Sequence, residues 1–542
     1  MGTDVEQAFD LVVNDAKIVD GTGAPAVTGS VGIRGGRIAE VAAAPLAGSR
    51  VIDADGRVLA PGFIDLHTHA DFTLPAHPGA ASMIRQGVTT QVVGNCGFSP
   101  FPAPDHAVAE LRAATAWLDA GLDWGSWDDA ASFLAYVQAA TPACNVAFLV
   151  GHGAVRNAVL GGDDRRPSAT ELAAMAGHVE AAMRAGAVGL STGLTYAPGV
   201  YAEPDEIHHL AAVAAAHGGF YASHMRNESS GLLAAVDEIL AVGEDAGAPV
   251  QISHLKALGR ANWGLIDDAL TRLDAAVAAG RDVLADQYPY TAGSTTLAVQ
   301  TPAWARTGGT AEMQRLLRDP AARDRIRAEI AAQDPDDLRA GLRVFEPEAI
   351  RLAQLPEGID PAHEGRTVAE VARIRDEESV DTALWLLEVG GGGVLTTVHA
   401  ISEDGVRTVM RHPAVAVASD GWTLDPAAGG TPHPRSYGTF ARVLGTYVRD
   451  EGVLSLEEAV RKMTSLPARR LPGLDLGVIT AGGRGDLVVF DPDTVADRAT
   501  FDAPHAFAEG VSHVVVGGHL VVDDGVQTDA RPGVVLRGRG AR

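Results

Sequence analysis

Residues 61–71, PGFIDLHTHAD, decide the fold. A Pro-Gly pair precedes a short apolar run, and this run leads directly into His67-Thr68-His69. Side chains alternate between the two faces of a strand, so both imidazoles point to the same side and can share one metal ion. The stretch predicts a strand whose carboxyl end carries metal ligands. The alternative is a pair of exposed or capping histidines.

The same arrangement recurs along the middle of the chain, where apolar strands alternate with Ala/Leu-rich helical segments. This alternation is typical of βαβ units and a parallel sheet. Candidate strands end at GFIDLHTH, TTQVVGNCG, NVAFLVGHG, AVGLSTGL, GFYASHMR, PVQISHLK, DVLADQYPY, VLTTVHA and AVAVASDG. A (β/α)₈ barrel needs eight strands, one fewer than these candidates. We place VLTTVHA outside the ring or within an insertion.

The two ends of the chain differ from the middle. Both consist of short strand patterns separated by Gly- and Asp-rich turns, which indicates one small domain made from both termini. We therefore predict an α/β protein with a (β/α)₈ TIM-type barrel over residues 61–474. A β-sandwich would combine residues 1–60 with 475–542. Between about 300 and 365 the alternation gives way to charged helical sequence, interpreted as an insertion after strand seven.

The composition excludes several classes of protein. Lys and Arg total 43 against 69 Asp and Glu, and the net charge of −26 disfavours a nucleic-acid or anionic-membrane surface. Two cysteines cannot form a disulfide framework, which favours a reducing compartment. The start, MGTDVEQAFD, lacks signal-peptide features, and no run approaches the ~18 apolar residues of a membrane span. We expect a cytoplasmic protein with a small-molecule substrate; the oligomeric state is not predicted.

Reactive side chains collect at the carboxyl ends of the candidate strands, the end that carries the active site in a barrel. They are His67, His69, Cys96, His224, His254 and Asp420. Cys96 lies among glycines in VVGNCGFS, and a thiolate is a strong zinc ligand that can bridge two ions. One thiolate and two imidazoles leave a coordination position open, which indicates catalysis. Cys144, in TPACNV, is interpreted as an inert buried cysteine.

Asp420, in VAVASDGW, ends the last candidate strand. A carboxylate there can take a proton from water and later give it to a leaving amine. A turn aspartate before Gly421 is the alternative.

A competing motif is GLSTG at residues 189–193, which fits the G-x-S-x-G nucleophile elbow of serine hydrolases. That motif needs a helix directly after the serine, whereas Pro198 blocks an early helix here and the next one starts near Pro204. We keep a serine hydrolase using Ser191 as a remote alternative.

The chain resembles the N-acyl-D-amino-acid deacylases (D-aminoacylases) of the amidohydrolase superfamily nearly end to end. The resemblance is carried by PGFIDLHTHAD, GVTTQVVGNCGFSPFP, GLSTGLTYAPG, SHMRNES, ISHLKALG, DQYPYTAGST, SDG and HPRSYGTFARVLG. It implies a distorted (β/α)₈ barrel with a small β-sandwich. It also implies one tight zinc on Cys96, His224 and His254, and a second, weaker site with His67, His69 and Asp420. No lysine ends the fourth candidate strand, so Cys96 takes the place of the carbamylated lysine of other superfamily members.

The same resemblance implies the roles of further residues. Zinc would polarise the amide carbonyl, and Asp420 would act as general base and acid. Substrate contacts would come from Tyr196, Lys256, Tyr288, Ser294 and Arg435. Lys256 and Arg435 would form the carboxylate clamp, the Tyr196 phenol would donate to the same carboxylate, and the Tyr288 phenol would donate to the scissile carbonyl. Members that prefer acidic D-amino acids carry an Arg shortly after the segment GSTTL; here none occurs before Arg306, which implies apolar substrates. Hydrolysis of a cyclic amide or another acylated amine, and a non-catalytic descendant, remain alternatives.

Overall fold

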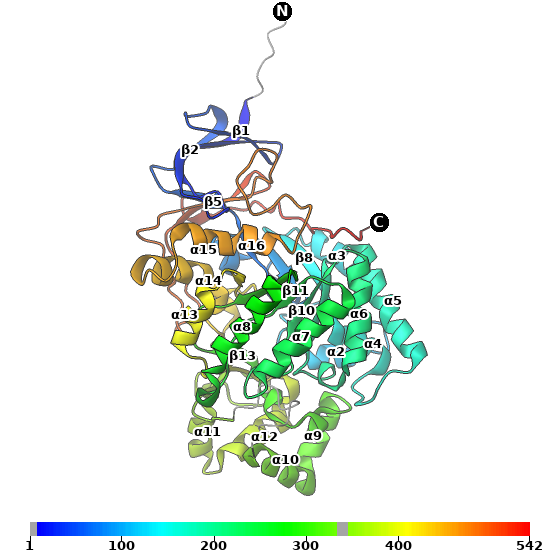
Figure 1. Ribbon diagram of the computed structural model, residues 1–542. Helices are drawn as coiled ribbons and strands as arrows, with labels where there is room; N and C mark the ends of the chain where they lie inside the picture. The colour runs from blue at the N-terminus through cyan, green and yellow to red at the C-terminus, as the bar shows by residue number, and fades with distance from the viewer. Residues whose placement is uncertain (1–7, 333–344, 542) are drawn as a thin grey trace, which may run out of the picture.

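The computed structural model describes residues 8–332 and 345–541. Residues 1–7, which carry part of the expectation about targeting, and 333–344, inside the predicted insertion, lie outside the described residues. Figure 1 shows a central barrel with a sheet from both termini at one end and a group of helices at the other.

The central sheet is a parallel barrel of eight strands in the order β16-β12-β11-β10-β9-β8-β7-β6. The strands are β6 (Phe63–Asp65), β7 (Val88–Val93), β8 (Asn145–Gly151), β9 (Gly189–Gly193), β10 (Phe220–His224), β11 (Val250–Ile252), β12 (Val283–Gln287) and β16 (Val415–Val417). They are buried on both faces, as parallel strands in a barrel must be. In β8, Ala147 and Leu149 pack in a cluster with Ile64 and Phe220 of other barrel strands, whereas Phe148 belongs to the larger cluster that includes the helices.

The barrel closes between its first and last strands at the residues that follow them. The amide of Asp420 donates to the carbonyl of His67 over 2.8 Å, and the amide of His69 donates to the carbonyl of Gly421 over 2.8 Å. A parallel bridge joins Thr68 to Gly421. Closure therefore fixes the first and last predicted ligand segments against each other.

Helices surround the barrel, and α5, α6, α7 and α8 pack against one another in succession (Figure 1). The α-helices of the barrel region are α1 (Ala81–Ile84), α2 (Val108–Ala114), α3 (Ala130–Ala139), α4 (His152–Leu160), α5 (Ala169–Ala185), α6 (Pro204–Ala216), α7 (Leu232–Ala246), α8 (Leu265–Ala278), α13 (Glu403–Arg411), α14 (Arg435–Arg442), α15 (Leu456–Met463) and α16 (Ser465–Ala468). Sequence signals set their ends: α5 begins with a capping box of Ser168 and Glu171 and ends at Gly186, whose φ is 119°.

Between β12 and β16 the chain forms a separate layer. It contains a three-stranded antiparallel sheet of β13 (Gly293–Thr296), β15 (Leu395–Val398) and β14 (Ile350–Gln354), in that order. The helices are η4 (Leu297–Gln300), η5 (Ala303–Arg306), α9 (Thr310–Arg318), α10 (Pro320–Ala332), α11 (Val368–Arg375) and α12 (Ser379–Gly390). Strand β15 is the VLTTVHA segment, which lies outside the ring as predicted. The described elements of this layer extend beyond 300–365 on both sides, and its domain boundaries stay a prediction.

Both termini contribute to a nine-stranded sheet, ordered β20-β19-β18-β17-β5-β1-β2-β3 with β4 paired to β1. Its strands are β1 (Phe9–Ile18), β2 (Val27–Arg34), β3 (Arg37–Ala42), β4 (Gly48–Asp53), β5 (Val58–Pro61), β17 (Leu487–Phe490), β18 (Val511–Val516), β19 (His519–Asp523) and β20 (Val526–Gln527). A separate apolar cluster that includes Leu11, Ile33 and Leu487 forms its core. The predicted fold class, a barrel with a β-domain from both ends, is confirmed.

Within the described residues, no helix combines the length and the apolar character needed to cross a bilayer.

Candidate metal centre

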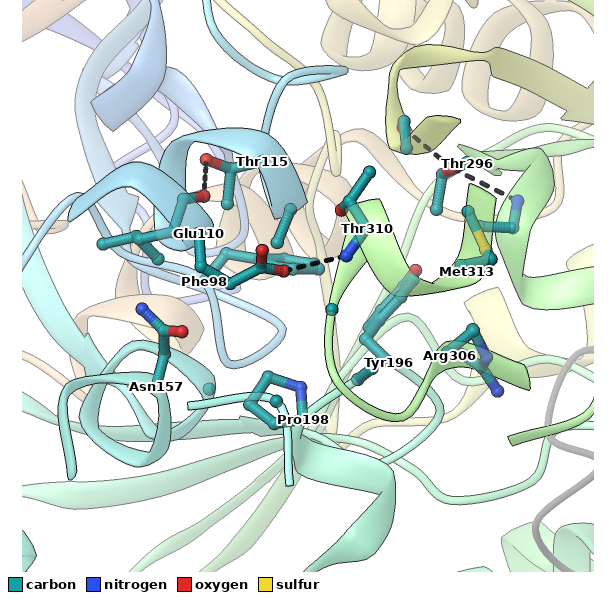
Figure 2. A pocket seen from close by; sticks show the side chains of 18 of the residues that line it. Phe98, Glu110, Thr115, Asn157, Tyr196, Pro198, Thr296, Arg306, Thr310 and Met313 are labelled. Carbon is teal, nitrogen blue, oxygen red and sulfur yellow. Dashed lines mark hydrogen bonds between the residues drawn. The ribbon is translucent and has the colours of Figure 1, made fainter. Parts of the chain in front are cut away.

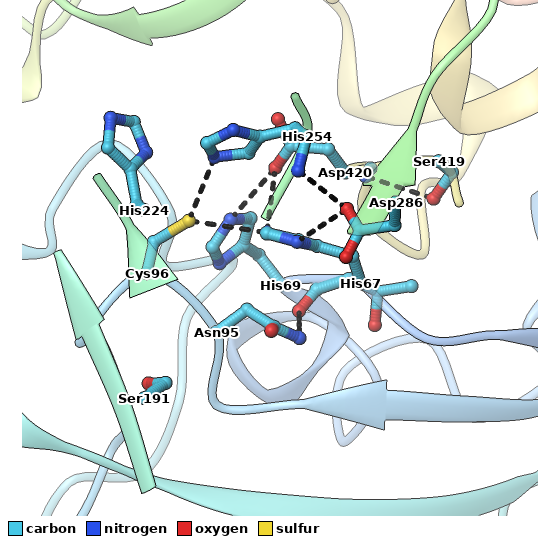
Figure 3. A network of polar contacts seen from close by, with 12 residues as sticks. His67, His69, Asn95, Cys96, Ser191, His224, His254, Asp286, Ser419 and Asp420 are labelled. Carbon is cyan, nitrogen blue, oxygen red and sulfur yellow. Dashed lines mark hydrogen bonds and ion pairs between the residues drawn. The ribbon is translucent and has the colours of Figure 1, made fainter. Parts of the chain in front are cut away.

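The six predicted ligands come together at the carboxyl ends of the barrel strands. Their donor atoms form two groups, in each of which all atoms lie within 4.8 Å of one another. One group contains His67, His69, Cys96 and Asp420, and the other contains Cys96, His224 and His254. Every member is buried, and Figure 3 shows the Cys96 sulfur between the rings of His67 and His254. Strand ends distant in sequence thus create one compact set of nitrogen, sulfur and oxygen donors.

Cys96 is common to the two groups. Its Sγ lies 3.2 Å from His67 Nε2 and 3.5 Å from His254 Nε2. Burial raises the pKa of this thiol to about 11, although the neighbouring His67 acts to lower it. A thiol in such surroundings becomes a thiolate when a cation lies against it.

The backbone at three of these residues adopts the left-handed region. The φ angles are 54° at Cys96, 35° at His254 and 52° at Asp420. A non-glycine residue held in a sparsely populated region costs about 1–3 kcal/mol and persists only where the surroundings enforce it. The backbone conformation that directs these three side chains into the centre therefore lowers the stability of the fold.

Two carboxylates orient the imidazoles, and neither was predicted from the sequence. Asp286 Oδ1 lies 3.2 Å from His67 Nδ1 and accepts the backbone amide of His254 over 2.7 Å. Glu228 Oε1 lies 2.9 Å from His254 Nδ1. A partner on one ring nitrogen fixes the tautomer and leaves the other nitrogen for a metal. Both residues lie inside quoted motifs, DQYPY and SHMRNES, but their spacing gave no reason to single them out.

His224 supplies the test of whether these residues fit a metal. The residue is 3% exposed, neither ring nitrogen makes a hydrogen bond, and Nε2 lies 3.6 Å from Glu228 Oε2. Burial is the largest factor that lowers its pKa well below the ordinary value, so the ring is neutral and has a lone pair to offer. Because an unsatisfied buried polar group costs free energy, the arrangement is one that a bound cation would complete. The donor set fits a divalent metal.

The carboxylate of Asp420 lies close to His67, His69 and Arg435. Its Oδ1 lies 3.1 Å from His69 Nε2, and its Oδ2 lies 2.7 Å from Arg435 Nη1. Burial alone would raise the pKa of Asp420, but Arg435 and His67 outweigh it and hold that pKa well below its ordinary value. Asp420 is therefore an ionised carboxylate beside the other donor atoms.

A cavity of about 490 Å³, here called the ligand cavity, opens onto this centre. Of the predicted substrate contacts it is lined by Tyr196, Lys256, Tyr288 and Ser294, together with Glu228 and Gln300. Burial raises the pKa of Tyr288 to about 12, so the phenol keeps its proton for donation. A Cβ on Gly293 would stand 3.0 Å from the Tyr288 hydroxyl, so the glycine keeps that space clear.

The cation of the ligand cavity is Lys256, which belongs to a buried pair. Its Nζ donates to Glu228 Oε1 over 2.7 Å and lies 2.9 Å from His254 Nδ1. Burial opposes the charge, but Glu228 outweighs it and raises the pKa of Lys256, which holds the ammonium form.

Arg435 lies on the far side of Asp420 and does not line the ligand cavity. Its guanidinium stands 5.0 Å from the centre of the Tyr288 ring and 5.4 Å from that of Trp422. The arginine predicted for a substrate carboxylate already faces the carboxylate of Asp420.

Ser191 does not form a nucleophile elbow. It is fully buried on β9, its hydroxyl donates to the Gly94 carbonyl, and that hydroxyl accepts the Gly97 amide over 3.0 Å. A Cβ on Gly193 would lie 1.9 Å from the Cys96 carbonyl, which explains the second glycine of the motif. GLSTG therefore supports the Cys96 loop, and the serine-hydrolase alternative has no geometric basis.

Aromatic rings that the sequence analysis did not assign surround the centre. Trp117 lies 6.5 Å from His69 and 6.3 Å from Trp422, and Phe98 lies 4.8 Å from Tyr196, between ring centres. These residues come from loops around the barrel mouth and form an apolar border beside the donor set.

The chain is similar to characterised proteins over nearly its whole length. A model of the amidohydrolase family matches residues 50–522. An N-acyl-D-glutamate deacylase of Alcaligenes xylosoxydans xylosoxydans is 39% identical over 98% of this chain and 97% of its own. A D-aminoacylase of the same organism is 36% identical over 98% of both chains.

A solved structure gives the same result. The N-acyl-D-glutamate deacylase of Bordetella bronchiseptica, crystallised with zinc and a phosphonate that mimics the tetrahedral intermediate, matches with a TM-score of 0.82 and 35% identity. The match covers 98% of this chain and 100% of that chain. Together with the buried donor set, these similarities show that the chain is a metal-dependent hydrolase of the amidohydrolase family and belongs with the N-acyl-D-amino-acid deacylases.

Proposed function

We propose that this protein hydrolyses the amide bond of N-acyl-D-amino acids, releasing a carboxylic acid and a free D-amino acid. One observation carries the proposal: the ligand cavity is lined by Cys96, His224, His254 and Asp420 and also by the Lys256 ammonium and the Tyr288 phenol. Metal ligands, an acid–base carboxylate and a fixed cation suit a substrate that has both an amide and a carboxylate. The D preference follows the relatives.

Zinc is the metal we propose. Cys96, His224 and His254 would hold one ion, and His67, His69 and Asp420 a second, weaker one, with Cys96 common to both groups. Thiolate, imidazole and carboxylate are the ligand types of Zn²⁺. Bound Zn²⁺ supplies Lewis acidity to the scissile carbonyl.

The side chains around the donor set divide the remaining work. Asp420 accepts the proton of the attacking water on a carboxylate oxygen and delivers it to the leaving nitrogen. The Tyr288 phenol donates to the carbonyl oxygen as negative charge develops there. Lys256 binds the α-carboxylate, with Tyr196 and Ser294 on the same cavity. Arg435 stays a predicted carboxylate contact, and its pair with Asp420 adds a second task, fixing the orientation of that carboxylate.

The preferred amino-acid side chain has two candidates. Leu297, Ala298 and Val299 stand where an arginine would favour acidic substrates, and they support an apolar side chain such as that of leucine. Acidic D-amino acids are the second candidate because Arg306 is 7% exposed and lines the cavity next to the ligand cavity. Equal kcat/KM for N-acetyl-D-leucine and N-acetyl-D-glutamate would exclude a preference for either class.

The testing experiment measures amine release from N-acetyl-D- and N-acetyl-L-leucine on protein of known metal content. We expect turnover of the D isomer alone, lost with a chelator and restored by zinc. Cys96→Ala should lose bound metal, whereas Cys144→Ala, which removes the other buried thiol, should keep it. If the metal-bound protein released amine from neither isomer, the proposed substrate would be overturned. Cyclic amides and other acylated amines would then be screened.

We also propose a cytoplasmic location and no nucleic-acid partner. Both cysteines are unpaired, as a reducing compartment requires, and the net charge is −26. Cell fractionation tests the location.

A further inference from the structure

A second cavity, of about 800 Å³, adjoins the ligand cavity. Figure 2 shows residues that line it. Trp117 and Tyr196 line both cavities and form the wall that they share. The 800 Å³ include open solvent at the mouth of the cavity, and the space lies directly beyond these two rings. Ala298, Val299 and Arg306, named above for the amino-acid side chain, lie at its η4–η5 side, and no role has been given to the rest of its lining.

The lining of the second cavity is mainly carbon. Phe98, Leu111, Trp117, Val299 and Met313 contribute large apolar side chains from different elements. Glu110 and Arg306 also line it, but each is engaged with the backbone: Glu110 Oε1 accepts the Thr310 amide over 3.1 Å, and Arg306 donates to the Thr195 carbonyl over 2.8 Å. Burial raises the pKa of Glu110. An apolar occupant gains most in such surroundings.

Strand β13 relates the second cavity to the scissile bond. Gly293 lies beside the Tyr288 hydroxyl, Thr295 Oγ1 lies 3.1 Å from the Tyr196 hydroxyl, and Thr296 lines the second cavity. The strand thus leads from Tyr288, past Tyr196, into the second cavity.

The imidazoles give the same order. Between ring centres, Tyr288 lies 6.4 Å from His254, His254 lies 4.4 Å from His224, and His224 lies 4.9 Å from Tyr196. Lys256 is at the Tyr288 end, with its Nζ 5.7 Å from that ring centre. Lys256 lines the ligand cavity and does not line the second cavity, which begins at Tyr196.

We propose that the second cavity is the subsite for the acyl chain, and that the substrates are N-acyl-D-amino acids with a long or bulky apolar acyl group. This inference rests on the proposed function. With the α-carboxylate on Lys256 and the scissile carbonyl at the donor set, the acyl chain is the substituent that extends away from the cation. It then passes Trp117 and Tyr196 and enters the apolar space beyond them.

The test compares kcat/KM for the N-acetyl, N-butanoyl, N-hexanoyl and N-octanoyl derivatives of D-leucine on the metal-loaded, full-length protein. Burial of one methylene corresponds to about a three- to fourfold gain, so kcat/KM should rise steeply until the cavity is full. A flat or falling series with N-acetyl-D-leucine turned over would overturn the subsite and leave the proposed function intact. No turnover at any length would overturn both.

A filling variant tests the location. Ala114 lies at the end of α2 and lines the second cavity, whereas Ala109 is exposed on the same helix and does not line it. Ala114→Phe should lower kcat/KM for N-octanoyl-D-leucine by about tenfold or more and leave N-acetyl-D-leucine within about twofold. Ala109→Phe should change neither. Ala154→Leu, from α4, fills the same cavity and serves if Ala114→Phe does not fold.

One outcome would assign the cavity differently. If Ala114→Phe spared the acyl series but lowered kcat/KM for N-acetyl-D-glutamate or N-acetyl-D-phenylalanine relative to N-acetyl-D-alanine, the occupant would be the amino-acid side chain. That result would overturn the acyl assignment.

Discussion

The ligand cavity and the second cavity share the wall of Trp117 and Tyr196 but are built in opposite ways. The first is formed by residues that follow barrel strands, with backbone in the left-handed region and carboxylates on the imidazoles. The second lies among α2, α4, η4 and α9, and its lining is mainly apolar. Polar networks fail when one partner is lost, whereas apolar cavities tolerate changes of shape. Substitutions in the ligand cavity should therefore lower kcat/KM strongly and by the same factor for every acyl group. Substitutions in the second cavity should lower kcat/KM less, and mainly for long acyl groups.

The largest effect is expected from Asp420→Asn. The amide cannot shuttle the proton, so kcat should fall about 10²–10⁴-fold for every acyl length. Metal analysis should show that the ion on Cys96, His224 and His254 stays bound. A variant within about tenfold of wild type would contradict the acid–base role, and a loss that varied with acyl length would contradict the separation of the two cavities.

The second largest effect is expected from Glu228→Gln. Lys256, 7% exposed, would lose its carboxylate partner, and His254 would lose the group on its Nδ1. Removing one partner of a buried ion pair costs about 3–5 kcal/mol, so denaturant titration should show a loss of that order and KM should rise equally for all acyl lengths.

Glu238→Gln is the matched control. Glu238 pairs with Arg226 over 2.9 Å but its side chain is 18% exposed, so the loss should stay near 1 kcal/mol or below. Equal losses in the two variants would show that Glu228 has no special place at the centre.

The pH dependence of stability tests how firmly the wall of the second cavity is held. Glu206 lies 2.8 Å from His152 and also pairs with Arg156 of α4, the helix that contributes Ala154 and Asn157 to that cavity. Burial opposes ionisation, but His152 and Arg156 outweigh it and lower the pKa of Glu206 to about 2. Because the folded value lies below the ordinary 4.5, this stabilisation is complete above about pH 4.5 and is lost as pH falls toward 2.

The shift corresponds to about 3 kcal/mol. Urea titrations of wild type and Glu206→Gln between pH 6 and 3 should therefore approach each other toward pH 3 without meeting, because the pKa of about 2 lies below this range. Parallel curves would show that the ion pair contributes nothing between those values.

The contrast between the cavities also explains what the sequence could predict. The ligands were accessible because each follows an apolar strand directly, and parallel strands place their carboxyl ends at one edge. VLTTVHA was excluded from the ring by count alone. Glu228 and Asp286 act through side-chain contacts, which spacing does not encode. The pairing of Arg435 with Asp420 could not be predicted for the same reason.

The second cavity was inaccessible for a further reason. Leu111, Ala154, Val299 and Met313 are ordinary apolar residues of different elements, and their sequence positions give no sign that they leave a space between them. An apolar residue beside a cavity has the same local pattern as one in a filled core. Only packing distinguishes them.

The smallest predicted effect concerns the shared wall. Thr295→Val keeps the shape of the side chain and removes the contact of 3.1 Å between Thr295 Oγ1 and the Tyr196 hydroxyl. A single hydrogen bond contributes about 0.5–1.5 kcal/mol, so kcat/KM should change about two- to tenfold. If the Tyr196 hydroxyl serves the α-carboxylate, KM should rise by the same factor for N-acetyl and N-octanoyl substrates. If Tyr196 only forms the wall between the cavities, kcat/KM should fall for the N-octanoyl substrate alone. The ratio between the two substrates therefore assigns Tyr196 to one cavity or the other, and a ratio unchanged from wild type assigns it to the ligand cavity.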